Sequence, residues 1–283
     1  IALLLVACRS SSGRDTTAAP PASAAAVESG DSSEQGHVDP LPSDHAVIHD
    51  DDEKALGDLA EIEERRTLRV LVTGTEESFL PRSGLPASHD RALVKEFAAR
   101  HGLQVRFLLV AGYDELLPHL EQGRGDLIAA RLTVTKARQE RVAFTRPINT
   151  VDELLVGKAG AQDAPKAPED LANRTVHVVA SSHAESLEAL REKAPGLKVE
   201  RVTLADDEEL VWRVSQGALP LTVVDSDTLR AITAYNDGVQ PLFPIAKGRQ
   251  IAWAVRKDAV QLKAALDAFL IEKSLSAHSE EPE

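Results

Sequence analysis

The stretch Gly125-Asp126-Leu127-Ile128-Ala129-Ala130-Arg131-Leu132-Thr133-Val134-Thr135-Lys136-Ala137-Arg138 decides the fold of this chain. It opens on a turn-forming glycine and a short apolar run, which predicts a buried strand over residues 126–130. A polar loop with two threonines and two arginines follows the run. Because ligands of open α/β sheets bind at the carboxyl ends of the strands, we expect this loop to line a binding site.

Apolar runs alternate with amphipathic segments on both sides of that stretch. Further strands are predicted over residues 68–72, 105–110, 150–158, 175–180, 199–202, 221–224 and 251–256. Helices are predicted over residues 57–66, 91–100, 113–122, 181–193, 206–216 and 261–271. The alternation is typical of βαβ units around a parallel sheet, so the fold class is α/β. Its repetition after residue 150 predicts a second lobe.

Length and composition limit the possible functions. The chain has 283 residues, enough for one large or two modest domains. Its formal net charge of −13 disfavours a nucleic-acid partner. One cysteine excludes an intrachain disulfide and a cysteine zinc cluster. There is no methionine, so we expect the chain to begin inside a longer precursor.

The first eight residues are expected to be the end of a lipoprotein signal peptide. Residues 1–7 are purely apolar and too short to span a bilayer. Leu5-Val6-Ala7-Cys8 resembles the lipobox of bacterial lipoproteins, which implies lipidation of Cys8. Arg9 is not the aspartate associated with inner-membrane retention, which allows an outer-membrane anchor in a cell with two membranes. The alternative is a buried cysteine in an apolar segment.

Residues 9–55 are rich in Ala, Ser, Pro, Gly and Asp and lack a hydrophobic period, so a disordered tether is predicted. It contains His37, His45 and His49 beside residues 50–52, all aspartates. We expect no metal site there, because nothing in such a segment would hold the ligands in a fixed geometry. Residues 274–283 are predicted to form an acidic tail.

Several motifs occur together in an order and spacing that resemble a known family. They are Leu68-Arg69-Val70-Leu71-Val72, residues 125–138, Val142-Ala143-Phe144-Thr145-Arg146-Pro147, Val178-Val179-Ala180-Ser181-Ser182, Val223-Val224-Asp225 and Ile251-Ala252-Trp253-Ala254-Val255-Arg256-Lys257. Together they resemble the family 3 extracellular solute-binding proteins of the amino-acid-binding type. The resemblance implies a type II periplasmic-binding-protein fold, with two α/β lobes joined by two hinge strands. Lobe 1 would comprise residues 56–150 and 243–273, and lobe 2 residues 151–242.

Within this family, Gly57-Asp58-Leu59-Ala60-Glu61-Ile62 and the step Asp225-Ser226 are most similar to one subgroup. That subgroup is the non-catalytic N-terminal domain of membrane-bound lytic murein transglycosylase F. Glu77-Ser78-Phe79 resembles the start of a transglycosylase acid motif, but no lysozyme-like helical domain accompanies it. We therefore expect no enzyme activity. A dehydratase on the same scaffold is a third hypothesis, for which no cleft acid can be assigned.

The resemblance also implies ligand-binding residues. Arg138 matches the arginine that pairs with the ligand carboxylate, and the alternative is a surface arginine in a charged loop. Asp225 matches the aspartate that holds the ligand ammonium, and the alternative is a cap for a helix beginning at Ser226. Thr133 matches a hydroxyl or backbone contact in the same loop.

Four further residues complete the predicted site. Ser181 and Ser182 begin a helix whose amides would receive the ligand carboxylate, or they only cap that helix. Phe79 falls at the position of an aromatic lid, or it belongs to the core. Arg131 stands where the family has a small residue. It implies a more anionic ligand, or a cleft partly filled by its own side chain.

These observations predict a lipid-anchored, periplasmic or extracytoplasmic binding protein for an amino acid, a short peptide or a related anionic or zwitterionic ligand. The alternative is a regulatory module of a murein-cleaving system that senses cell-wall peptides. No cofactor and no metal are expected. The expected partners are the small ligand, an ABC permease or the murein machinery, and a membrane reached through the lipid anchor. We expect a monomer.

Overall fold

The computed structural model describes residues 45–48, 54–73, 89–179, 181–202 and 205–279. All of them belong to one compact unit, residues 42–283. The strands are β1 (His45–Val47), β2 (Thr67–Thr73), β3 (Gln104–Val110), β4 (Leu127–Ile128), β5 (Ala143–Lys158), β6 (Thr175–Val178), β7 (Lys198–Arg201), β8 (Leu221–Asp225) and β9 (Val239–Val255). The helices are α1 (Leu59–Glu64), α2 (His89–Arg100), α3 (Tyr113–Glu121), α4 (Lys136–Gln139), the 3₁₀ helix η3 (Pro168–Leu171), α5 (Ser181–Glu188), α6 (Asp207–Ser215), α7 (Ser226–Thr233) and α8 (Val260–Ser279).

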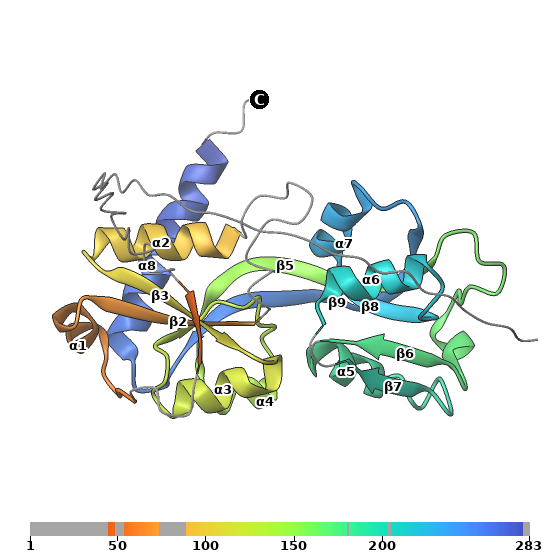
Figure 1. The fold of residues 1–283 in the computed structure, drawn as a ribbon, viewed down its shortest axis with the longest axis horizontal. Coiled ribbons are helices and arrows are strands. Elements are labelled where there is room, and N and C mark those ends of the chain that lie inside the picture. Colours follow the sequence, from red (N-terminus) through yellow and green to blue (C-terminus); the bar gives the residue numbers. More distant parts are fainter. Residues whose placement is uncertain (1–44, 49–53, 74–88, 180, 203–204, 280–283) are drawn as a thin grey trace, which may run out of the picture. The chain divides into compact units, whose positions relative to one another are not determined.

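Two long strands connect the two halves of the fold. The described strands are hydrogen-bonded in the order β1-β3-β2-β4-β9-β5-β8-β6-β7. β5 and β9 run antiparallel side by side from one half to the other, with several register shifts along their length (Figure 1). Parallel pairs lie on each side of them, β2 with β3 and β4, and β6 with β7 and β8. The prediction of two α/β lobes joined by two strands is confirmed.

Alternation of side chains along the strands builds a core on each face of the sheet. Val70 of β2 packs with Phe97 of α2, whereas the next residue, Leu71, packs with Leu116 of α3. Successive strand residues point to opposite faces, so helices are needed on both sides. Figure 1 shows α2 and α8 on one side of β2 and β3, and α3 on the other. In the second half, residues 223 and 224 divide in the same way between the cores that include α5 and α6.

Gly125 and Asp126 attach the central stretch to β2. A Cβ on Gly125 would lie 2.5 Å from Leu71 Cγ, so only glycine allows this close approach. The Asp126 carboxylate is fully buried. It accepts hydrogen bonds from the Arg69 amide at 2.8 Å, the Arg69 guanidinium at 2.8 Å and the Arg65 guanidinium. These bonds place the residues after β4 at the carboxyl edge of the sheet.

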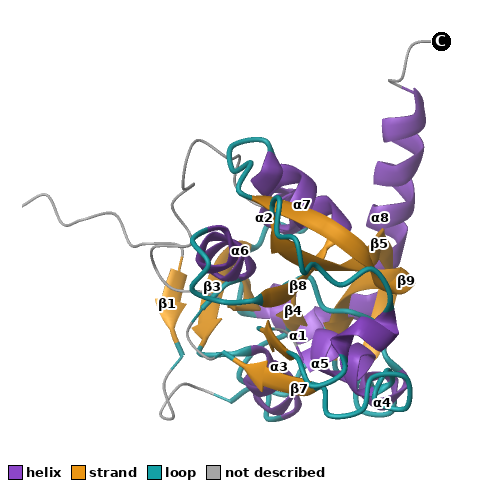
Figure 2. Ribbon diagram, turned by 90° about the vertical axis from the view of Figure 1, so that its right-hand side faces the viewer, coloured by secondary structure: helices purple, strands orange, loops and turns teal. Residues whose placement is uncertain are grey.

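The structure differs from the sequence prediction in several elements. β5 begins at Ala143 and β9 at Val239, well before the predicted residues 150 and 251, and α5 ends at Glu188 instead of residue 193. β1 lies inside the segment predicted to be a tether, because residues 45–47 pair in parallel with β3. β4 has two residues instead of the predicted five, and the chain turns at Arg131, whose φ of 51° is left-handed. α8 runs on to Ser279, into the segment predicted to be an acidic tail. Its C-terminal part extends away from the strands (Figure 1, Figure 2).

Candidate functional site

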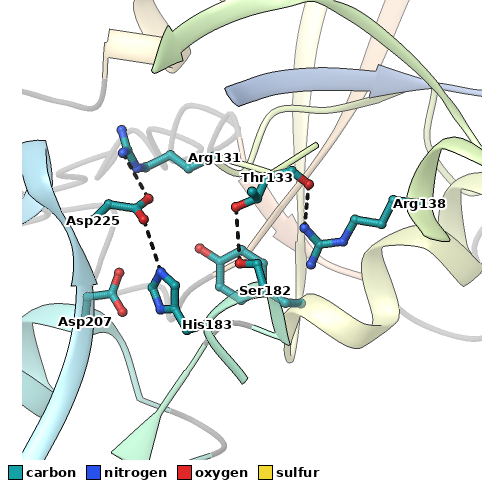
Figure 3. Close-up of a pocket in the computed structure, with 8 residues that line it drawn as sticks. Arg131, Thr133, Arg138, Ser182, His183, Asp207 and Asp225 are labelled. Atoms are coloured by element: carbon teal, nitrogen blue, oxygen red, sulfur yellow. Dashed lines mark hydrogen bonds and ion pairs between the residues drawn. The ribbon is translucent and has the colours of Figure 1, made fainter. Parts of the chain in front are cut away.

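A small cavity lies where the ends of strands and helices from both halves of the fold meet. Its volume is about 10 Å³, enough for one water molecule. Figure 3 shows the lining side chains directed toward one another. Almost all of them are polar. They are Tyr113, Arg131, Thr133, Arg138, Ser182, His183, Asp207 and Asp225.

Arg138 is a buried cation in α4, with 7% of its surface exposed. The Thr135 side chain caps α4 by accepting a hydrogen bond from the Arg138 amide. Arg138 Nη1 donates to the carbonyl oxygen of Thr133 at 2.7 Å. Burial lowers the pKa of Arg138, but an arginine keeps its charge in proteins. The short helix therefore presents a positive group to the cavity.

Thr133 and Ser182 connect the two halves across the cavity. Thr133 Oγ1 donates a hydrogen bond to Ser182 Oγ at 3.2 Å, and both residues are buried. Thr133 also forms an isolated bridge with Ile251 in β9. Ser182 lies in the first turn of α5, which begins at Ser181. Free amides at such a helix start favour an anion.

Asp225 and His183 form a buried pair on the second half. His183 Nε2 lies 3.1 Å from Asp225 Oδ1, and the side chains are 2% and 9% exposed. Burial is the largest influence and disfavours charge on both groups, but their mutual hydrogen bond and the opposite charges around them together outweigh burial. The pKa of His183 is therefore raised and that of Asp225 lowered, as in an ion pair.

Arg131 reaches from the first half to carboxylates of the second. Its Nη2 donates to both Asp227 oxygens, at 2.7 and 2.9 Å, and lies 3.5 Å from Asp225 Oδ2. Asn149 donates to the same Asp227 carboxylate at 2.6 Å. Burial is the largest influence and opposes the charge of Arg131, but the attractions of Asp227, Asp225 and Asp90 together outweigh it and raise the pKa of Arg131. The guanidinium thus fills one side of the cavity.

Asp207 and Tyr113 complete the lining. Asp207 begins α6, and burial raises the pKa of its carboxyl group to about 6. Its Oδ1 and the Nδ1 atom of His183 are both buried, and neither has a hydrogen-bond partner among the described residues. Burial also raises the pKa of Tyr113 to about 12, so its hydroxyl stays protonated at neutral pH.

Comparisons with known proteins identify the family. Residues 71–277 match the bacterial extracellular solute-binding proteins, family 3. The chain belongs to this family. Its fold is similar to the arginine-bound form of truncated ArgBP from T. maritima, with a TM-score of 0.66 and 26% identity over 76% of this chain and 99% of that one. An ancestral arginine-binding protein bound to arginine matches with a TM-score of 0.65 and 25% identity, over 75% of this chain and 94% of that one. These type II periplasmic amino-acid-binding proteins confirm the predicted fold.

Family 3 relatives with curated names are longer than this chain. The membrane-bound lytic murein transglycosylase F of Stutzerimonas stutzeri (strain A1501) is 30% identical over 75% of this chain and 44% of its own length. The Methylobacillus flagellatus protein of the same name is 31% identical over 66% of this chain and 38% of its own length. The chain therefore spans less than half the length of these relatives, and the predicted resemblance to this subgroup is confirmed.

The structure brings most of the predicted family 3 site residues together. Arg131, Thr133, Arg138, Ser182 and Asp225 all line the one cavity. Ser181 begins α5, but its side chain is outside the description, and Phe79 and Cys8 also lie outside the described residues. Sequence reasoning missed Tyr113, His183 and Asp207. The position of His183 directly after Ser182 is a signal that could have identified it.

No metal centre or membrane-crossing helix is found in the part of the chain that the structure describes. Within those residues, no group of three or more His, Cys, Asp and Glu side chains is placed to hold a metal ion. In the same residues, no helix is both long and apolar enough to cross a bilayer.

Asp207 makes the stability of the protein depend on pH. Its pKa rises from an ordinary 3.8 to about 6 on folding, so the folded state keeps a proton that the unfolded state releases. This contribution is fully present below about pH 4 and is lost as pH rises through about 6. Between pH 4 and 7.5, the Asp207→Asn variant should gain about 2–3 kcal/mol of unfolding free energy relative to the wild type. Urea denaturation at both pH values measures this gain, and parallel stability curves would contradict it.

Proposed function

We propose that this chain is an extracytoplasmic binding protein whose two lobes close around an amino acid, a short peptide or a related small zwitterionic ligand. One observation carries the proposal: the Arg138 guanidinium and the Asp225 carboxylate line the same cavity, with the hydroxyls of Thr133 and Ser182 beside them. A buried positive group and a buried negative group on one cavity suit a ligand that carries both charges. The lobes would be residues 56–150 with 243–273, and residues 151–242.

The ligand carboxylate would bind Arg138, whose planar fork of donors matches a carboxylate. The amides at the start of α5, at Ser181 and Ser182, would add donors to the same group. The ligand ammonium would bind the Asp225 oxygen that does not contact His183. Arg131 would border the ligand, with its guanidinium held by Asp227.

Ligand entry requires the two halves to separate, because a cavity of about 10 Å³ is too small for an amino acid. Several polar contacts between described residues join the halves in the present conformation. They include Thr133 with Ser182 at 3.2 Å, Arg131 with Asp227 at 2.7 Å, and Arg201 with Asp114 at 2.6 Å. The register shifts between β5 and β9 lie on the two strands that connect the halves, which are the natural place for a hinge.

Cellular placement follows from the family and from the N-terminal sequence. Family 3 proteins are extracellular solute-binding proteins, and the curated relatives are named as membrane-bound. A lipid on Cys8 would tether the binding domain to a membrane through the residues after it, and Arg9 allows an outer-membrane anchor in a cell with two membranes. An ABC permease would then receive the ligand. We propose that the domain acts as a monomer.

A second candidate is a non-catalytic regulatory module that senses cell-wall peptides. The observation that favours it is the name shared by the relatives from S. stutzeri and M. flagellatus, membrane-bound lytic murein transglycosylase F. In this case the same cleft would bind a peptide released from murein. The matched domain is a solute-binding domain, so on either proposal binding is its role.

A thermal-shift screen with free amino acids and muropeptides tests the proposed function. A ligand at 100 times its dissociation constant should stabilise the protein by about 2.7 kcal/mol. Asp225→Asn should greatly reduce the shift, because the amide lacks the charge that holds the ammonium. A response to amino acids alone favours transport, and a response to muropeptides alone favours the regulatory module. If neither class shifts the wild type, the binding function is wrong.

A further inference from the structure

The acidic side of the cavity contains polar atoms that the proposed contacts leave unused. Asp207 Oδ1 and His183 Nδ1 are buried and have no hydrogen-bond partner among the described residues. The His183 side chain is 2% exposed, and both residues line the cavity. In Figure 3 the imidazole lies beside the carboxylate of Asp207 and below that of Asp225. Buried polar atoms without partners are costly, so a ligand group that satisfies both would gain binding energy.

Both of these atoms can accept hydrogen bonds, so the ligand group that binds them must be a hydrogen-bond donor. An ionised Asp207 carboxylate can only accept hydrogen bonds. When His183 donates its Nε2–H to Asp225, the neutral imidazole presents a lone pair at Nδ1. A positive ligand group beside His183 favours that neutral form, because like charges disfavour each other, and the displaced proton passes to solvent. A guanidinium or ammonium group could therefore donate hydrogen bonds to both Nδ1 and Oδ1.

The neighbouring side chains show that this side of the cavity holds such a cation. The Arg131 guanidinium is bound here by Asp227 and approaches Asp225 at 3.5 Å. That pairing uses Asp227, and His183 uses one oxygen of Asp225. Asp207 is the acid of the cavity lining that neither contact occupies. The pKa of Asp207 is raised because burial disfavours its negative charge more than the nearby positive groups favour it. A cation at Oδ1 would stabilise that charge.

We propose that Asp207 and His183 form a second ligand subsite, which receives a cationic group at the far end of the ligand. The cleft then prefers basic amino acids, with the carboxylate on Arg138, the α-ammonium on Asp225 and the second cation on Asp207. This inference rests on the proposed function, since it places a further part of the same ligand in the same cleft.

Two pairs of similar ligands test the subsite by isothermal titration calorimetry at pH 7.5. L-arginine is compared with L-citrulline, and L-lysine with L-norleucine, because each pair differs chiefly in the distal charge. The wild type should bind the basic member of a pair at least about tenfold more tightly. Asp207→Asn should reduce that ratio to about threefold or less. Asp163→Asn removes a carboxylate whose side chain is 84% exposed and should keep the wild-type ratio.

The outcomes separate the subsite from the proposed function. If both members of each pair bind the wild type equally well, the subsite is wrong and the proposed function stands. A preference that survives Asp207→Asn also overturns the subsite. If no probe and no amino acid binds, the proposed function fails and the subsite fails with it. Thermal unfolding of Asp207→Asn distinguishes a lost preference from a lost fold.

Discussion

Replacing Asp126 by alanine is expected to destabilise the protein by about 3–5 kcal/mol. The carboxylate is 0% exposed and is the counter-ion of the Arg69 guanidinium, which is itself buried. The Asp126 carboxylate also accepts a hydrogen bond from the backbone amide of Arg69 in β2. Alanine removes these acceptors from the buried Arg69 guanidinium and amide. The free energy lost in this way is larger than the net stabilisation that the ion pair provides. Since domains are stable by only about 5–15 kcal/mol, this is a large part of the total.

Urea denaturation followed by circular dichroism measures the loss. Asp258→Ala is a matched control, because Asp258 pairs with Arg256 at 3.5 Å but is 76% exposed. It should change the unfolding free energy by less than about 1 kcal/mol. Equal effects of the two substitutions would show that the Asp126 network does not hold the central stretch against β2.

Replacing Arg138 by alanine is expected to lower ligand affinity by about 100-fold or more, which corresponds to about 2.7 kcal/mol. The guanidinium is buried, lines the cavity and is the proposed partner of the ligand carboxylate. A charged hydrogen bond in a desolvated site is worth more than one at the surface, so its loss cannot be replaced by water. Calorimetry with a ligand found in the screen measures the change.

Arg141→Ala is the control for this prediction. Arg141 lies three positions from Arg138, but its side chain is 47% exposed and pairs with Glu121 at 2.7 Å. Its loss should leave the affinity within about twofold, because surface pairs contribute little. Arg138→Lys should recover only part of the affinity, since an ammonium lacks the planar fork. An Arg138→Ala variant that binds as tightly as the wild type would exclude the assigned carboxylate contact.

Local sequence pattern was sufficient to predict the order of most elements. The apolar run of β2, with residues 68–72 all buried, could form only a strand covered on both faces. The start of α5 at Ser181 and the start of α7 after Asp225 also match the prediction, although the Asp225 side chain makes no capping hydrogen bond. Periodicity and capping depend on neighbouring residues, so a single sequence contains them.

Local sequence pattern was less reliable for segments whose structure depends on hydrogen bonds to residues far away in the sequence. β1 forms because residues 45–47 find a free edge on β3, about sixty positions further along the chain. The composition of that segment predicts disorder, and only the partner strand supplies hydrogen bonds. The start of α8 was predicted to within one residue, and there the Asp58 carboxylate accepts hydrogen bonds from the amides of Gln261 and Leu262 at 2.8 Å each. The extension of α8 to Ser279 was not predicted.

For the site, the residues that motifs could identify lie on the loop after β4 and at the ends of α5 and β8. Arg138 and Asp225 could be predicted, since they match ligand-binding positions that the resemblance to family 3 implies. The partners of Arg131 and the presence of His183 and Asp207 in the cavity could not, because they arise from contacts with residues far away in sequence. Arg131 meets Asp227 across 96 positions, and His183 meets Asp225 across 42. Folding alone buries Asp207 and raises its pKa to about 6, since desolvation is a property of the packed structure and not of the sequence around a residue.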